Sequence, residues 1–250
     1  MVNSLVLMRL VRGPRFALDP AMVIDGVPAI DPAIEPIYFG HSQGGISGGV
    51  YLALSTEVRR AMLGVPGAPY GLLLPRSIDF DPFLLLVFLR YSSAVDRISL
   101  MHVLQQLWDR AEPAGFLNLL ASQPEKTALF QYGLGDSQVS WLGTYAQARS
   151  IGAAAFSSQV LEGNETLFGF ETFGDGEVIA NRSAIAGWSY PDVAGPAPMT
   201  NTPPLRESDT HGFPRTDSRA LLQMDRFFRT GDIANFCDGP CVCPGDDPQC

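Results

Sequence analysis

The chain has 250 residues, of which 46% are hydrophobic and 17% are charged, a composition typical of a folded globular protein and not of a disordered one. With 17 Lys and Arg against 26 Asp and Glu, the net charge of −9 argues against nucleic acid and anionic membrane surfaces as partners. The longest purely apolar run, residues 83–89, is too short to span a bilayer, so no membrane span is expected.

The first predicted element is a helix over residues 3–12, capped by Asn3 or Ser4 and ended by Gly13. Residues 14–34 are rich in proline and are predicted to form a loop. The start of the chain has no basic segment leading into an apolar run, so the sequence predicts no signal peptide there.

A β-prone strand at residues 36–39 leads into a G-x-S-x-G pattern, written Gly40-His41-Ser42-Gln43-Gly44. In this pattern the serine lies on a sharp strand-to-helix turn, and glycine fits the crowded positions two residues to either side. The turn raises the serine oxygen above the sheet. It also directs the first N–H groups of the next helix toward the atom that the serine attacks. The pattern therefore predicts a nucleophile elbow.

A helix with many small residues is expected to follow the serine and to run to about residue 55. Gly45, Gly48 and Gly49 indicate that this helix lies close to a sheet. Two other interpretations remain: a glycine-rich turn that only packs, and a phosphate-binding loop. The second lacks the lysine of a P-loop and the G-x-G-x-x-G order.

With this elbow the sequence resembles the α/β-hydrolase family, in particular bacterial serine esterases and lipases. The resemblance covers about residues 35–231 and implies a mostly parallel sheet flanked by helices. Only one helix and a loop precede the elbow, whereas the family has several strands there and a loop that supplies the second oxyanion donor. The resemblance therefore implies an N-terminally short hydrolase, whose exposed sheet would be covered by a second copy or by another chain.

A second buried strand is predicted at residues 61–65, followed by a turn at 67–71. Residues 72–120 then interrupt the alternation of strands and helices, and apolar residues recur at helical spacing in 98–108. The resemblance implies a helical lid that binds apolar acyl groups here; the alternative is ordinary helical packing over the edge of the sheet.

The remaining elements are predicted in order along the chain. They are a strand at 127–132, a helix marked by Val139, Leu142 and Ala146, a strand at 184–188, a long loop at 191–204, and a final helix capped by Thr216 or Asp217 and stopped by Gly231. This alternation predicts an α/β fold with a mostly parallel sheet covered on both faces. The expected division is a core of residues 1–71 and 121–236, a lid of 72–120 and a Cys-rich tail of 237–250.

A serine hydroxyl needs a neighbouring base to become a good nucleophile, and the chain has three histidines. His41 lies on the elbow, where its side chain should point away from the serine, and His102 lies in the predicted lid helix. His211 follows the last predicted strand, where the resemblance implies the base. His211 is therefore the predicted general base, with a solvated loop histidine as the alternative.

The base needs a carboxylate that holds its tautomer, and Asp136 follows the strand at 127–132. The order Ser42, Asp136, His211 is similar to the Ser…Asp…His order of the α/β-hydrolases. Asp192 and Asp209 are the competing carboxylates, with a purely surface role as their alternative.

The predicted function is hydrolysis of small carboxylic esters through an acyl-enzyme, with the backbone N–H of Gln43 in the oxyanion hole and without a cofactor or metal. The sequence shows no second oxyanion donor, and the lack of one would lower the activity. The alternatives are a weakly active or inactive hydrolase-fold fragment and an amidase or peptidase on the same fold.

All four cysteines lie in the tail, at positions 237, 241, 243 and 250. Two disulfides are favoured because a small, loop-rich tail has no core of its own; zinc is the alternative, although the spacing lacks paired C-x-x-C motifs. Disulfides imply secretion or the periplasm, which conflicts with the missing signal peptide. The simplest expectation is that the chain lacks its natural N-terminal part.

Overall fold

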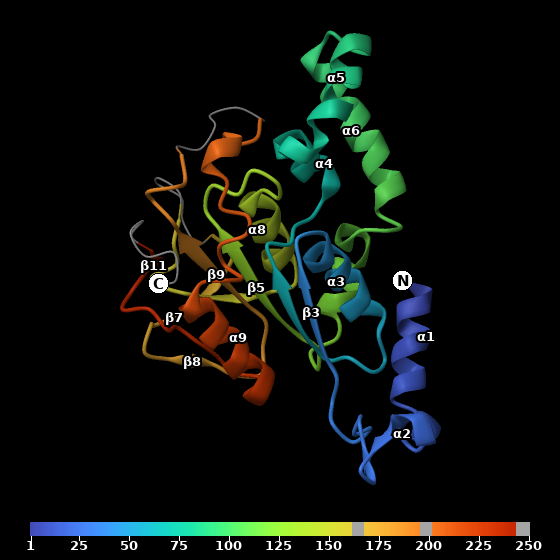
Figure 1. Ribbon diagram of the computed structural model, residues 1–250. Helices are drawn as coiled ribbons and strands as arrows, with labels where there is room; N and C mark the ends of the chain where they lie inside the picture. The colour runs from blue at the N-terminus through green and yellow to red at the C-terminus, as the bar shows by residue number, and fades with distance from the viewer. Residues whose placement is uncertain (162–167, 196–201, 244–250) are drawn as a thin grey trace.

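The computed structural model describes residues 1–161, 168–195 and 202–243. Its centre is a parallel sheet with helices on both faces (Figure 1). The strand order is β3-β4-β5-β9-β6-β7, and β11 pairs with β9. The strands are β3 (Ile37–His41), β4 (Arg60–Gly64), β5 (Thr127–Gly133), β6 (Ala154–Phe156), β7 (Glu171–Phe173), β9 (Ala184–Ser189) and β11 (Cys241–Val242). The predicted α/β class, with a mostly parallel sheet flanked by helices, is confirmed.

The two faces of the sheet carry separate apolar cores because side chains alternate along each strand. On β5, Phe130 and Tyr132 pack with one cluster and Leu129 with the other, and all three are at most 1% exposed. The first face is covered by α3 (Gln43–Leu54), α7 (Leu117–Ala121) and α8 (Trp141–Ser150). The second face is covered by α9 (Ser218–Thr230).

The N-terminal segment differs from the predicted capped helix and loop. Helix α1 (Val2–Val11) begins after Met1 and has no side-chain cap, so Asn3 and Ser4 lie inside it; Arg12, and not Gly13, is its C-cap. The predicted loop contains a helical turn α2 (Pro14–Ala17), a 3₁₀ turn (Pro20–Met22) and a hairpin of β1 (Val23–Ile24) and β2 (Val27–Pro28). Asp25 and Gly26 form the hairpin turn with φ of 50° and 80°, a local signal that proline content obscured.

Strand β3 leads to the elbow and forms one edge of the sheet, next to β4. It runs two residues further than the predicted 36–39 strand and includes His41. Among the described residues, no strand pairs with its outer side. The Phe39 side chain is 50% exposed, so the face of this strand that bears Phe39 is only partly covered.

Helix α3 packs closely on the sheet through the predicted glycines. A Cβ atom on Gly48 would lie 2.4 Å from the Tyr38 ring, and one on Gly45 would lie 2.5 Å from the Gly64 carbonyl oxygen. At the elbow, a Cβ on Gly40 would lie 2.3 Å from the Gly44 carbonyl oxygen, so glycine is required there. The expected crowding at Gly44 is wrong, because a Cβ there would meet nothing within 4 Å.

The segment between β4 and β5 is helical, as expected from its apolar spacing. Its elements are α4 (Tyr70–Leu73), two 3₁₀ turns (Leu74–Arg76 and Ile78–Phe80), α5 (Asp81–Arg90), α6 (Ala94–Trp108), a further 3₁₀ turn (Pro113–Phe116) and α7. Helices α5 and α6 project away from the sheet at the top of Figure 1. Gln105 joins α6 to α4, since the Gly71 N–H donates to its Oε1 at 2.8 Å.

In the second half of the chain, the predicted strands correspond to β5 and β9. The expected helix begins at Trp141, so Val139 lies before it. The sequence missed β6, β7 and β8 (Val178–Ile179), which have three, three and two residues and are too short to show a periodicity. The predicted loop at 191–204 contains no helix or strand in its described part, and residues 196–201 lie outside the described residues.

The last helix has the predicted ends. Asp217 caps α9 by accepting the N–H groups of Arg219 and Ala220, and Gly231 terminates the helix with a φ of 84°; the alternative cap, Thr216, is not used. After it, β10 (Ile233–Ala234) pairs with β8 in an antiparallel arrangement.

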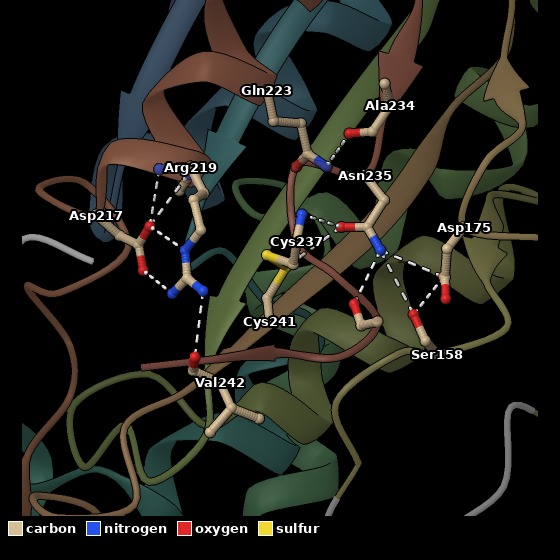
Figure 2. The surroundings of a disulfide bond; sticks show 12 residues. Ser158, Asp175, Asp217, Arg219, Gln223, Ala234, Asn235, Cys237, Cys241 and Val242 are labelled. Atoms are coloured by element: carbon tan, nitrogen blue, oxygen red, sulfur yellow. Dashed lines mark hydrogen bonds and ion pairs between the residues drawn. A yellow bond between two sulfur atoms is a disulfide. The ribbon is translucent and has the colours of Figure 1, made fainter. Parts of the chain in front are cut away.

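The C-terminal segment returns to the sheet through β11 and is closed by a disulfide between Cys237 and Cys241 (Figure 2). The Asn235 carbonyl oxygen Oδ1 accepts the Cys237 N–H at 2.9 Å, which fixes the start of this loop. Disulfide formation is thus confirmed for this pair. Sulfur atoms in a disulfide are not the thiolates that bind zinc, so Cys237 and Cys241 do not form a zinc site. Cys243 is also disulfide-bonded, whereas Cys250 lies outside the described residues.

In the part of the chain that the structure describes, no helix is both long and apolar enough to cross a bilayer.

Candidate active site

The predicted catalytic residues follow different elements that meet at the carboxyl edge of the parallel sheet. Ser42 comes directly after β3, Asp136 follows the end of β5, and His211 lies between β9 and α9. In parallel sheets the carboxyl ends of adjacent strands share one edge, where binding and catalytic residues gather. Three segments that are distant in sequence are thus available to one site.

Ser42 has a backbone conformation that residues other than glycine rarely adopt, with φ of 59° and ψ of −126°. Its N–H donates to the Gly64 carbonyl oxygen of β4 at 2.9 Å, which fixes the turn onto the neighbouring strand. Among the described residues, its hydroxyl has no hydrogen-bond partner. Ser42 therefore has the strained strand-to-helix turn expected of an elbow, with a hydroxyl that is not engaged elsewhere.

His211 and Asp136 form a buried pair. His211 Nδ1–H donates to Asp136 Oδ2 at 2.8 Å, and the two residues are 8% and 1% exposed. The other Asp136 oxygen, Oδ1, accepts the N–H groups of Gln138 at 2.9 Å and Val139 at 2.8 Å. The carboxylate thus fixes the orientation and tautomer of the imidazole, leaving Nε2 as the nitrogen that can accept a proton.

The pKa values of this pair follow from burial and charge. Burial alone would lower the pKa of His211, but the hydrogen bond and charge of Asp136, with the charges of Asp209 and Asp79, raise it above its ordinary value. Burial raises the pKa of Asp136, while the hydrogen bonds from His211 and from two backbone N–H groups oppose that shift. His211 is thereby a stronger base than a solvated histidine.

The two competing carboxylates do not accept from the His211 ring. Asp209 accepts the N–H of Ser137 at 2.9 Å, the Gln138 side-chain amide at 2.7 Å and the N–H of His211 at 3.1 Å. Burial would raise the pKa of Asp209, but these hydrogen bonds hold it below its ordinary value. Asp209 therefore fastens the Asp136 loop to the His211 loop, whereas Asp192 is exposed.

The elbow and the His211 loop touch through His41. His41 Nε2–H donates to the His211 carbonyl oxygen at 3.0 Å, and the two rings meet edge to face with centroids 5.3 Å apart. The third histidine, His102, is exposed on α6, where its Nδ1 bonds to the Ile98 carbonyl oxygen of the same helix.

Gln43 lies at the first position of α3, and its side-chain amide is engaged with other residues. Its amide nitrogen donates to the Tyr70 hydroxyl at 2.9 Å and to Ser47 at 3.3 Å. Its backbone N–H has no acceptor among the described residues, as is usual in the first turn of a helix. That N–H remains the candidate oxyanion donor, and no second donor can be assigned within the described part of the chain.

Sequence reasoning missed three features of this site. They are the His41 contact with His211, the bridging role of Asp209, and Val65, which follows β4 with a φ of 41° and so is unusual for a β-branched residue. The alternation of side chains along a strand could have indicated the His41 contact, because it places His41 on the face opposite Gly40. No sequence signal points to Val65.

The described residues contain no group of three or more His, Cys, Asp or Glu side chains arranged to hold a metal ion. No protein-family model matches this chain, and neither the search of curated proteins nor that of solved structures found a match. Its function has to be inferred from its own residues.

Proposed function

We propose that this protein is a serine hydrolase of the α/β-hydrolase type that cleaves carboxylic esters through an acyl-enzyme. Ser42 is the nucleophile, His211 the general base, and Asp136 the carboxylate that orients His211. The backbone N–H of Gln43 donates to the oxyanion, and no cofactor takes part.

The observation that carries the proposal is the 2.8 Å bond from His211 Nδ1–H to buried Asp136, beside an elbow in which Ser42 has a φ of 59°. A strained serine alone can be a packing feature, and a buried His–Asp pair alone can be structural. The His41 contact joins the elbow to the His211 loop at one edge of the sheet, and this supports a shared role in nucleophilic catalysis.

The reaction follows from these roles. Ser42 attacks the ester carbonyl carbon while His211 Nε2 takes the hydroxyl proton, and the resulting imidazolium is stabilised by Asp136. His211 then returns the proton to the leaving alcohol, and water hydrolyses the acyl-enzyme by the same sequence. Catalytic hydrogen bonds are often long before substrate binds, so the free Ser42 hydroxyl does not oppose the assignment.

Residues 72–120 support apolar esters as substrates. Helices α5 and α6 expose large apolar side chains, which include Phe83, Leu86, Leu89 and Val103 at 50% or more. Tyr70, just before this segment, bonds to Gln43 of the elbow and packs edge to face on Trp108 of α6, which links the segment to the site. The segment acts as a lid that receives the acyl group.

The test is labelling with a fluorophosphonate probe, which reacts covalently with activated serines. We expect the wild-type protein and Ser47→Ala to be labelled and Ser42→Ala to be unlabelled, with ester hydrolysis lowered by a factor of about 10⁴ or more. Ser47 is a matched control because it lies on the same helix, one turn from the elbow.

Labelling that persists in Ser42→Ala would overturn the assignment. No labelling of the folded wild-type protein would favour the alternative of a weak or inactive hydrolase fold. Paired ester and amide substrates with one acyl group separate an esterase from an amidase or peptidase.

A further inference from the structure

His41 contacts the backbone of the base and not its ring nitrogens. Its Nε2–H donates to the His211 carbonyl oxygen at 3.0 Å, across 170 residues of sequence. This carbonyl belongs to the residue whose imidazole must stay aligned with Ser42, and His41 precedes Ser42 in the chain. One side chain thus joins the backbone of the nucleophile to the backbone of the base.

The position of the His41 ring depends on a glycine in the neighbouring strand. A Cβ on Gly64 would lie 2.8 Å from His41 Nδ1, closer than real contacts of this kind. Gly64 also accepts the Ser42 N–H through its carbonyl oxygen. Its missing side chain therefore lets the His41 ring lie across the end of β4 and reach the His211 loop.

His41 is held in its uncharged form. Burial lowers the pKa of His41 to about 4, and the charges of His211 and Arg215 lower it as well, against the opposing effect of its bond to the His211 carbonyl. The imidazole therefore has one N–H, and the hydrogen bond uses it on Nε2. An uncharged His41 also leaves the positive charge of the reaction to His211.

We propose that His41 is a positioning residue, which holds the His211 loop against the nucleophile elbow through its hydrogen bond to the His211 carbonyl oxygen. The inference rests on the proposed function and names a further residue of the same site. Small displacements between reacting groups carry a large rate penalty, so this contact should affect the chemical step more than substrate binding.

The decisive comparison is between His41→Gln and His41→Leu. Glutamine can present an amide N–H near the place of Nε2, whereas leucine has a similar volume and no donor. We expect His41→Leu to lower kcat about tenfold with KM almost unchanged, and His41→Gln to recover most of that loss. Arg59→Leu, at an exposed position just before the amino end of β4, is the matched control and should behave as wild type.

Titration of active sites with the fluorophosphonate probe and thermal melting separate a lower rate from a smaller folded fraction. Equal impairment of the Gln and Leu variants would overturn the proposal, as would a His41→Leu variant with wild-type kcat. Gly64→Ala gives a second route: it should reproduce the loss of kcat, and it should add little to the effect of His41→Leu.

NMR gives a readout that needs no turnover, because three histidine ring signals can be assigned by single substitutions. We expect His41 to titrate near pH 4 and His211 above its ordinary value. The His211 Nδ1–H proton should exchange faster in His41→Leu and at the wild-type rate in His41→Gln. If the wild-type protein fails to react with the probe yet shows these shifts, the esterase assignment fails and the positioning role stands.

Discussion

Around His211, the carboxylates of Asp136 and Asp209 each accept several hydrogen bonds, some from neighbouring residues and some from a distant segment. Asp136 accepts from His211 and two backbone N–H groups, and Asp209 accepts from Ser137, Gln138 and the His211 backbone. A buried carboxylate without such donors would be costly, since an unpaired buried charge loses its hydration without compensation. Asp136 thus orients the imidazole, and Asp209 holds the two loops together.

The raised pKa of His211 predicts how activity depends on pH. Because the base must be uncharged and its pKa lies above the ordinary value of about 6.5, kcat/KM for an ester should fall as the pH drops through a value above 6.5. The stability has the opposite trend. The contribution of the His211–Asp136 interaction to the free energy of unfolding is fully present below about pH 6.5 and is lost as the pH rises through the folded-state pKa of His211.

The measurement is kcat/KM between about pH 5 and pH 9, beside Asp136→Asn. Removal of the Asp136 charge should lower both the rate and the pKa of the acid limb, since Asp136 raises the pKa of His211. An acid limb below 6.5 in the wild-type protein would contradict His211 as the base.

At the scale of elements, the small residues of α3 set how closely the helix approaches β3 and β4. Tyr38 of β3 lies against Gly48, and its hydroxyl donates to the Gly44 carbonyl oxygen at 2.7 Å, so the ring is pinned and cannot move aside. The same approach places the first turn of α3 at the edge where Ser42 lies. The packing of the helix and the geometry of the elbow therefore depend on each other.

Gly48→Ala should destabilise the protein by about 1–3 kcal/mol, because the new methyl group would overlap the pinned Tyr38 ring. Gly44→Ala is the matched control: its methyl group meets nothing, and alanine favours a helix over glycine by about 0.8–1.0 kcal/mol. Urea unfolding measures both. Equal stabilities for the two variants would show that α3 is not packed against β3 in this way.

At the scale of the whole molecule, β3 forms an edge of the sheet, and no strand among the described residues pairs with its outer side. Strand β3 reads Ile-Tyr-Phe-Gly-His, with neither a charged side chain nor a proline among its five residues. Exposed edges of this kind invite pairing with other strands. His41 is the last residue of this strand and Ser42 follows it, so this open edge of the sheet is also part of the candidate site.

Phe39→Lys should therefore reduce aggregation on concentration and on mild heating, because it places a charge on the open edge strand. Its free energy of unfolding should change by less than about 0.5 kcal/mol, as Phe39 is half exposed. Light scattering measures the first effect. Leu205→Lys, at a loop position that is 63% exposed, is the control, and the edge has no special role if both variants aggregate equally.

Local signals in the sequence determined the elements with strong patterns. The G-x-S-x-G turn, the strands β5 and β9, and the caps of α9 at Asp217 and Gly231 all lie where the residues predict them. These features depend on backbone conformation and on contacts within a few residues, which propensity and periodicity describe. Strands of two or three residues, such as β6 and β8, gave no pattern, because pairing with neighbours and not propensity makes them strands.

The choice between partners for His211 needed the tertiary structure. Asp136 and Asp209 are both plausible from the sequence, yet Asp136, 75 residues away, contacts the ring, and Asp209, two residues away, contacts the backbone. The same holds for His41, whose partner is 170 residues distant. Such contacts are set by strand order and by which segments meet at the carboxyl edge of the sheet, and no stretch of sequence contains that information by itself.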